Sequence, residues 1–124
     1  MAVNNETGVK TDWEAIAEIA DQYHIPFVLD GVALLGKEKF QLPKGVSAAF
    51  FSGHKIYAPK GVGALFLRRR PRVRLKSIIS GGGQERGFRS GTLPTPLCVG
   101  LGEACAIAEK EMGAEFGSAK NPLL

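Results

Sequence analysis

Three short, almost uninterrupted apolar runs constrain the fold of this chain more than any other feature. They are residues 27–29 (FVL), 48–51 (AAFF) and 63–67 (GALFL). Apolar runs of this length without alternating polar residues are typical of strands buried on both faces, as in parallel sheets. Between the runs and around them lie segments with a helical apolar period. Strands alternating with helices predict an α/β layered fold.

Two helices flank these runs. Asp12 or Thr11 can cap the first, and the second is predicted from about Thr95 to Met112. We therefore expect residues 1–112 to form a mainly parallel sheet with flanking helices. Residues 113–124 are small and polar without a period and are expected to form a loose tail. The opening residues 2–5 look like a strand leaving a sheet rather than the start of a domain.

The 124 residues, 44% of them hydrophobic and 23% charged, suit one ordinary globular domain or a part of one. No apolar run approaches the roughly 20 residues of a membrane helix, so no membrane association is expected. The N-terminus has neither the basic start nor the apolar core of a secretory signal. A cytoplasmic location is the resulting expectation.

Much of the net charge of +4 comes from one basic run, which comprises Arg68, Arg69, Arg70, Arg72, Arg74 and Lys76. Such a run can bind nucleic acid or another polyanion. No aromatic residue interleaves with the arginines, which weakens a single-strand-binding interpretation. A solvated strand end and turn is the preferred interpretation, and no nucleic-acid partner is expected.

The two cysteines, Cys98 and Cys105, lie seven residues apart on one face of the predicted second helix. Neither has His or Cys neighbours at metal-ligand spacing, so no metal site is predicted. Both are expected to be small buried hydrophobic residues.

Polar residues follow two of the apolar runs. Asp30 comes after residues 27–29, and Ser52-Gly53-His54-Lys55 comes after residues 48–51. Ligands of α/β sheets bind beyond the carboxyl ends of the strands, where these residues would share a crevice. A lysine and a carboxylate suit pyridoxal 5'-phosphate (PLP), which needs a Schiff-base lysine and a partner for its pyridine nitrogen. Burial would favour the deprotonated, nucleophilic lysine.

Each residue alone has a plainer interpretation. Asp30 precedes Gly31 and could be a turn residue, Lys55 could be an exposed lysine, and His54 could be structural. A second candidate stretch is residues 81–92 (GGGQERGFRSGT), whose glycines, arginines and hydroxyls could cradle an anion. It lacks the ending of a Walker loop and could equally be a flexible connector.

Together these stretches resemble the cysteine desulfurases, PLP enzymes of the class V aminotransferase superfamily. The matching motifs, in chain order, are VNNETG at 3–8, Asp30, SGHKIY at 52–57, PKGVGAL at 59–65, RRRPRVR at 68–74, and GGGQERGFRSGTL at 81–93. The resemblance extends from about Ala2 to Met112. It implies that residues 1–112 are an incomplete part of the large domain of PLP-dependent transferases of fold type I.

The resemblance also implies a role for each matching residue. Lys55 would form the Schiff base with PLP, and Asp30 would pair with the pyridinium. Asn5 would lie near the ring and the substrate carboxylate. Ser52 and His54 would bind the phosphate, and His54 could shuttle protons. Thr92 would reach the phosphate of PLP in the partner subunit of a homodimer.

The implied reaction takes sulfur from L-cysteine, leaves L-alanine, and passes the sulfur as a persulfide to an acceptor or scaffold protein for iron–sulfur cluster and thio-cofactor assembly. Ala33 stands where the family commonly has Gln, which puts cofactor tuning in doubt. The family's ring-stacking histidine, phosphate-binding Thr loop, persulfide cysteine and substrate-binding arginine have no counterpart among these residues. We therefore expect the chain to be inactive alone.

Three alternatives stay open. The chain could belong to another class V member, such as a selenocysteine lyase or an aminotransferase. It could be a non-catalytic, truncated or split-gene product that acts with a complementary chain. Polyanion binding by residues 68–76 ranks last.

Overall fold

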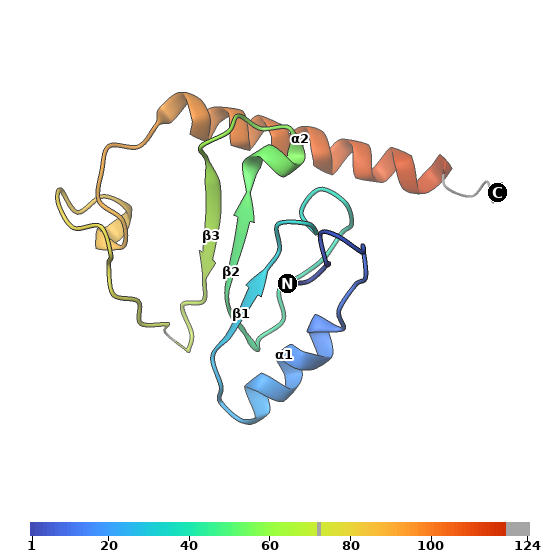
Figure 1. Cartoon of the computed structure of the whole chain (residues 1–124), viewed down its shortest axis with the longest axis horizontal. Coiled ribbons are helices and arrows are strands. Elements are labelled where there is room, and N and C mark those ends of the chain that lie inside the picture. The colour runs from blue at the N-terminus through green and yellow to red at the C-terminus, as the bar shows by residue number, and fades with distance from the viewer. Residues whose placement is uncertain (72, 119–124) are drawn as a thin grey trace.

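The computed structural model describes residues 1–71 and 73–118. A three-stranded sheet stands between two helices at opposite sides of the molecule (Figure 1). The elements are α1 (Trp13–Gln22), β1 (Phe27–Asp30), β2 (Val46–Ser52), the 3-10 helix η1 (Gly53–Ile56), β3 (Gly63–Leu67), the 3-10 turn η2 (Glu85–Gly87) and α2 (Thr95–Ser118). The α/β architecture expected from the sequence is confirmed.

The sheet is mixed, whereas a mainly parallel one was expected. β1 pairs with β2 in parallel, and β2 pairs with β3 antiparallel, in the order β1-β2-β3. The reason lies in the connections. A parallel pair needs a crossover of a dozen or more residues, and only residues 53–62 separate β2 from β3. The chain therefore turns back after η1, and β3 runs in the opposite direction.

Helix α1 begins where the sequence predicts. The side chain of Asp12 caps it by accepting a hydrogen bond from the Ala15 backbone N–H at 3.2 Å. Its buried residues Trp13, Ala17 and Ala20 face β1 and β2. Small residues on this face let the helix approach closely: at Gly45, which precedes β2, a Cβ atom would overlap the Ala17 carbonyl oxygen.

The main core lies between α1 and one face of the sheet. Trp13, Leu29, Leu34 and Val46 are its largest fully buried side chains. Phe40, in the connection before β2, packs edge-on to Trp13, with ring centroids 6.4 Å apart. The core is therefore built by α1, β1, β2 and the segment between the two strands.

The opposite sheet face is more open. Side chains alternate along strands, and the register aligns Val28 with Ala48, and Asp30 with Phe50, which in turn faces Leu65. Val28, Phe50 and Leu65 are exposed by 58%, 40% and 54%. Asp30 thus shares its face with a row of accessible apolar side chains.

Helix α2 is longer than predicted. It runs to Ser118, six residues past the expected end at Met112, so the expected loose tail does not begin at Gly113. The rest of that tail, residues 119–124, lies outside the described residues. Cys98 and Cys105 are both exposed, and the expectation that they are buried is wrong for this structure. The inner face of α2 packs on η1 through residues such as Leu101 and Ala104.

Within the described residues, no helix is long and apolar enough to cross a membrane, and no group of three His, Cys, Asp or Glu side chains could hold a metal ion.

The basic run divides into two parts. Arg68 is half-buried, and its guanidinium donates hydrogen bonds to the carbonyl oxygens of Leu42, Pro43 and Val46 at 3.0, 2.7 and 2.7 Å. It therefore ties the end of β3 to the start of β2. Arg69, Arg70, Arg74 and Lys76 are exposed, as a solvated strand end requires, and Arg72 lies outside the described residues.

We predict opposite effects of two Gly→Ala substitutions. Gly45→Ala forces a methyl group onto the Ala17 carbonyl and should lower the free energy of unfolding by about 1–3 kcal/mol. Gly102→Ala, in the exposed face of α2 where nothing approaches within 4 Å, should raise it by about 0.5–1 kcal/mol. Urea unfolding followed by circular dichroism measures both. Equal effects would contradict this packing of α1 on Gly45.

Candidate active site at the strand ends

Asp30 ends β1 beside its parallel neighbour β2. Its Cα pairs with that of Phe50, and the next residue, Gly31, donates its backbone N–H to the Phe50 carbonyl at 3.1 Å. The Asp30 Oδ1 atom accepts a hydrogen bond from the Val32 backbone N–H at 3.0 Å. The side chain is half-buried. The turn thus orients one carboxylate oxygen, as expected for an aspartate before glycine. The carboxylate lies at the C-terminal end of the strand.

Ser52 and His54 lie two and four residues beyond Phe50 and contact each other. The Ser52 hydroxyl and the His54 Nδ1 atom are 2.8 Å apart and share a hydrogen bond. The strand ends at Ser52, and η1 begins at the buried Gly53. A Cβ at Gly53 would stand 3.0 Å from the Val62 carbonyl and 3.1 Å from Leu101, so the tight packing leaves little room for a side chain at that position.

Lys55 lies in η1 and is exposed, so the burial expected for it is not realised here. Neither of the two salt bridges of the described residues, Lys10–Glu38 and Lys44–Asp21, involves it. Its amine therefore carries no carboxylate partner in this part of the chain. The parallel register brings Asp30 and the segment from Ser52 to Lys55 to the same end of the sheet, as predicted.

The N-terminal segment reaches the same sheet end. The Ala2 N–H donates to the Asp30 carbonyl at 2.8 Å, and Val3 bridges to Lys10 in a tight hairpin. Asn5 lies in the exposed turn of this hairpin, and its amide donates to Glu6. Residues 2–5 thus border β1 but form a single bridge rather than the expected strand.

Lys10 anchors this hairpin to the segment that follows Asp30. Its ammonium contacts the Glu38 carboxylate at 2.6 Å. The hydrogen bond to Glu38 raises the pKa of Lys10 above its ordinary value, and the charges of Glu38, Glu14 and Asp12 act in the same direction.

The glycine-rich stretch forms a closed loop rather than a flexible connector. Ser90, a buried polar residue, accepts a hydrogen bond from the Gly83 N–H at 3.2 Å through its hydroxyl, and its own N–H donates to the Ile79 carbonyl at 3.1 Å. Gln84 Oε1 accepts from the Gly91 N–H at 2.9 Å. These clamping roles of Gln84 and Ser90 were not predicted from the sequence. The sequence signal available for such clamps was a Gln and a Ser next to the turn-forming glycines of this stretch.

Thr92 follows this loop and is exposed. In the described part of the chain, no hydrogen bond joins it to Asp30, Ser52 or Lys55. Within one chain, the parallel register thus brings Asp30 and the segment from Ser52 to Lys55 to a common end of the sheet.

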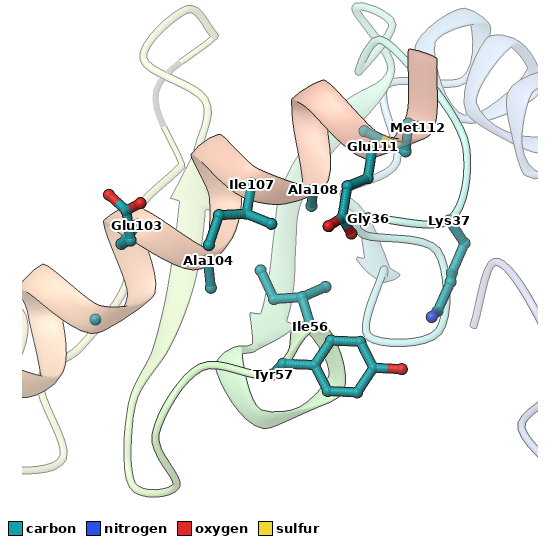
Figure 2. Close-up of a pocket in the computed structure, with 11 residues that line it drawn as sticks. Gly36, Lys37, Ile56, Tyr57, Glu103, Ala104, Ile107, Ala108, Glu111 and Met112 are labelled. Atoms are coloured by element: carbon teal, nitrogen blue, oxygen red, sulfur yellow. The ribbon is translucent and has the colours of Figure 1, made fainter. Parts of the chain in front are cut away.

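A pocket of about 280 Å³ lies next to this site rather than in it. Figure 2 shows Ile56, the residue after Lys55, facing Ala104 and Ile107 of α2, while the ring of Tyr57 extends toward Lys37. The Lys37 ammonium stands 5.7 Å from the centre of the Tyr57 ring. None of the residues predicted to bind a cofactor lines this pocket, so its apolar walls serve the packing of α2 on η1.

Comparison with known proteins identifies the family. The model of the family "Aminotransferase class-V" matches residues 1–123. The chain therefore belongs to the class-V aminotransferases.

Relatives within that family include cysteine desulfurases. The mitosomal cysteine desulfurase of Trachipleistophora hominis is 54% identical over 113 residues, and the cysteine desulfurase of Homo sapiens is 51% identical over 113 residues. Both matches cover 90% of this chain but only 26% and 25% of the relatives. The cysteine desulfurase IscS of Pseudomonas putida is 53% identical, over 93% of this chain and 29% of its own length. The chain thus spans about a quarter of these relatives.

Solved structures agree with the fold. A NifS-like protein superimposes with a TM-score of 0.84 at 40% identity, covering 92% of this chain and 32% of that one. A structure of SspA in complex with cysteine gives 0.79 at 42% identity, covering 85% and 30%. The small mixed sheet and its helices are therefore a part of the large domain of PLP-dependent transferases of fold type I.

We predict that Ser90→Ala opens the loop at residues 81–92. Losing one hydrogen bond worth about 1 kcal/mol should make trypsin cleavage after Arg86 and Arg89 roughly fivefold faster. Mass spectrometry of the early fragments measures it. Ser80→Ala, an exposed serine just outside the loop, is the matched control and should leave the rate unchanged. Equal rates in the two variants would rule out the clamp.

Proposed function

We propose that this chain is the part of a cysteine desulfurase that holds the Schiff-base lysine and the carboxylate for the pyridine nitrogen of PLP. The observation that carries the proposal is the placement of Asp30 beside the segment from Ser52 to Lys55, at the ends of two parallel strands. The cysteine desulfurase names of the relatives supply the reaction class. The proposed reaction moves the sulfur of L-cysteine to a thiol, which becomes a persulfide, and leaves L-alanine.

The residues present fit PLP. Asp30 has one oxygen directed by Val32 and stands at the sheet edge, where a carboxylate can accept the pyridine N–H. Lys55 supplies an accessible amine without a carboxylate partner in the described residues. The Ser52–His54 pair offers a hydroxyl and an imidazole N–H, both of which can bind a phosphate.

Each of these side chains has a distinct role in the proposed chemistry. When bound, PLP supplies an electron sink for the substrate Cα. The Asp30 carboxylate would hold the proton on the pyridine nitrogen. The Lys55 amine would hold the cofactor through its aldehyde and would serve as a base at the substrate Cα. His54 orients the Ser52 hydroxyl through their hydrogen bond and can move a proton at its other ring nitrogen.

Asn5 and Thr92 complete the proposed set. Asn5, in the hairpin turn that borders β1, would approach the ring and the substrate carboxylate. Thr92 is exposed and forms no hydrogen bond to Asp30 or Lys55 among the described residues, which is compatible with a role at the phosphate of a homodimer partner. Ala33, where the family commonly has Gln, leaves the cofactor hydroxyl without that amide partner. We assign no persulfide role to Cys98 or Cys105.

The whole enzyme would bind L-cysteine and deliver its sulfur to an acceptor or scaffold protein for iron–sulfur cluster and thio-cofactor assembly. A cytoplasmic location remains a proposal, because a mitosomal protein and the bacterial IscS proteins are both among the relatives. Selenocysteine lyase or aminotransferase activity is the alternative within the family. Measuring alanine release from cysteine and from selenocysteine by the full-length enzyme separates these reactions.

A non-catalytic role is the alternative of another class, because the chain spans about a quarter of its relatives. Such a chain would act only with a complementary chain. Co-expression with the remaining segments of a desulfurase distinguishes the two cases: alanine production that depends on Lys55 supports the enzyme, and association without any such production supports the non-catalytic role.

We predict that PLP is captured at Lys55. After incubation with PLP and reduction by sodium borohydride, peptide mass mapping should place the pyridoxyl group on Lys55, together with an absorbance band that Lys55→Ala abolishes. Lys60→Ala, an equally exposed lysine five residues away, is the matched control and should retain the band. Labelling spread evenly over the lysines, with no band dependent on Lys55, would refute cofactor capture by this chain.

A further inference from the structure

The backbone at Gly31 lies directly against the ring of Phe51. Gly31 is buried, and a Cβ atom there would overlap Cε1 of Phe51, with the ring's Cδ1 and Cζ as the next nearest atoms. Glycine is required at this position for space. The ring therefore occupies the volume that any side chain at position 31 would need.

Phe51 is in turn held by a row of aromatic rings. It stacks on Phe40 with centroids 6.0 Å apart and an interplanar angle of 28°. Phe40 meets Trp13 edge-on at 89°, and Trp13 is only 1% exposed. Aromatic pairs of this geometry add stability beyond their buried area. The row connects the core under α1 to Gly31.

Gly31 is the link between Asp30 and the backbone N–H that orients its carboxylate. The N–H of Gly31 donates to Phe50, its carbonyl accepts from Leu34 at 3.0 Å, and Val32 donates to Asp30 Oδ1 at 3.0 Å. A shift of Gly31 would move both ends of the Asp30–Val32 hydrogen bond. The direction of the carboxylate thus depends on where the Phe51 ring allows Gly31 to lie.

We propose that Phe51 is a positioning residue for Asp30: its ring, backed by Phe40 and Trp13, seats Gly31 so that the Asp30 carboxylate is held by Val32 and faces the pyridine nitrogen of the cofactor. This inference deepens the proposed function and rests on it for the cofactor. Phe51 itself contacts the backbone beside Asp30 and is not assigned a catalytic role.

The test measures the Asp30–Val32 hydrogen bond in the 124-residue chain without cofactor. NMR gives the amide hydrogen-exchange rate of Val32 in the wild type and in Phe51→Leu, with Asp30→Ala as the reference for a lost bond. We expect Phe51→Leu to speed exchange at Val32 roughly three- to tenfold, toward the Asp30→Ala rate, as the loss of one net hydrogen bond implies. Gly31→Ala should do the same, and the double variant, in which the shorter leucine leaves space for the methyl group, should recover part of the loss.

Phe66→Leu is the matched control. Phe66 is half-buried on β3 and packs against the same core, but it is not among the atoms nearest to Gly31. It should lower the unfolding midpoint in urea as Phe51→Leu does and leave exchange at Val32 unchanged. Equal acceleration at Val32 in Phe51→Leu and Phe66→Leu, or no acceleration in either, would overturn the proposal because Phe51 would then act only through core stability.

A second readout links the residue to the cofactor. With PLP present, the pH midpoint of the absorbance band that depends on Lys55 should shift in Phe51→Leu and not in Phe66→Leu, because a nearby carboxylate sets the charge preference of the bound ring. A midpoint that is the same in both variants would overturn the cofactor-facing role. If the wild type has no Lys55-dependent band but Val32 responds as expected, the proposed function fails while the seating of Asp30 by Phe51 stands.

Discussion

The parallel pairing of β1 and β2 is the interaction on which the rest of the site depends. Its register sets Asp30 opposite Phe50, so that the residues that follow the two strands lie at the same end of the sheet. A shift of the register by one residue would turn every side chain to the other face of the sheet. Asp30 would then point into the core under α1. On the other side of β2, the hydrogen bonds from Arg68 to Leu42, Pro43 and Val46 tie the end of β3 to the start of β2.

Much of the fold could be predicted from the sequence, because buried strands leave a strong apolar signal. Gly63–Leu67 was predicted with its observed bounds, and β2 extends two residues before and one beyond the prediction. Strand direction could not be predicted in the same way, since an apolar run has no polarity along the chain. The antiparallel β3 follows from the short connection through η1. The exposure of Cys98 and Cys105 depends on which side of α2 packs against η1, and that contact is long-range.

The candidate site, like the fold, has features that could be predicted from the sequence and features that could not. Polar residues directly after predicted strands could be placed at the sheet edge by topology alone, and Asp30, Ser52 and His54 lie there. Their proposed roles rest on the chemistry that PLP needs and, residue by residue, on the family resemblance. The contact that supports Asp30 could not be predicted. It joins Phe51 and Gly31, which are 20 positions apart, through ring geometry that no local sequence pattern encodes. The hydrogen bonds of Gln84 and Ser90 could not be predicted for a related reason, because any Gln or Ser in a loop has the same local sequence pattern.

The open face of the sheet has a consequence for the electrostatics of Asp30. Val28, Phe50 and Leu65 are accessible on the face that also carries this carboxylate. Any surface that packs on these apolar side chains also displaces water from around Asp30 and lowers the local dielectric constant. A charge–charge attraction is several times stronger near a protein surface than in bulk water, and stronger still in the interior. Whatever covers this hydrophobic row would therefore determine how tightly the carboxylate holds a cationic ring, without touching the ring itself.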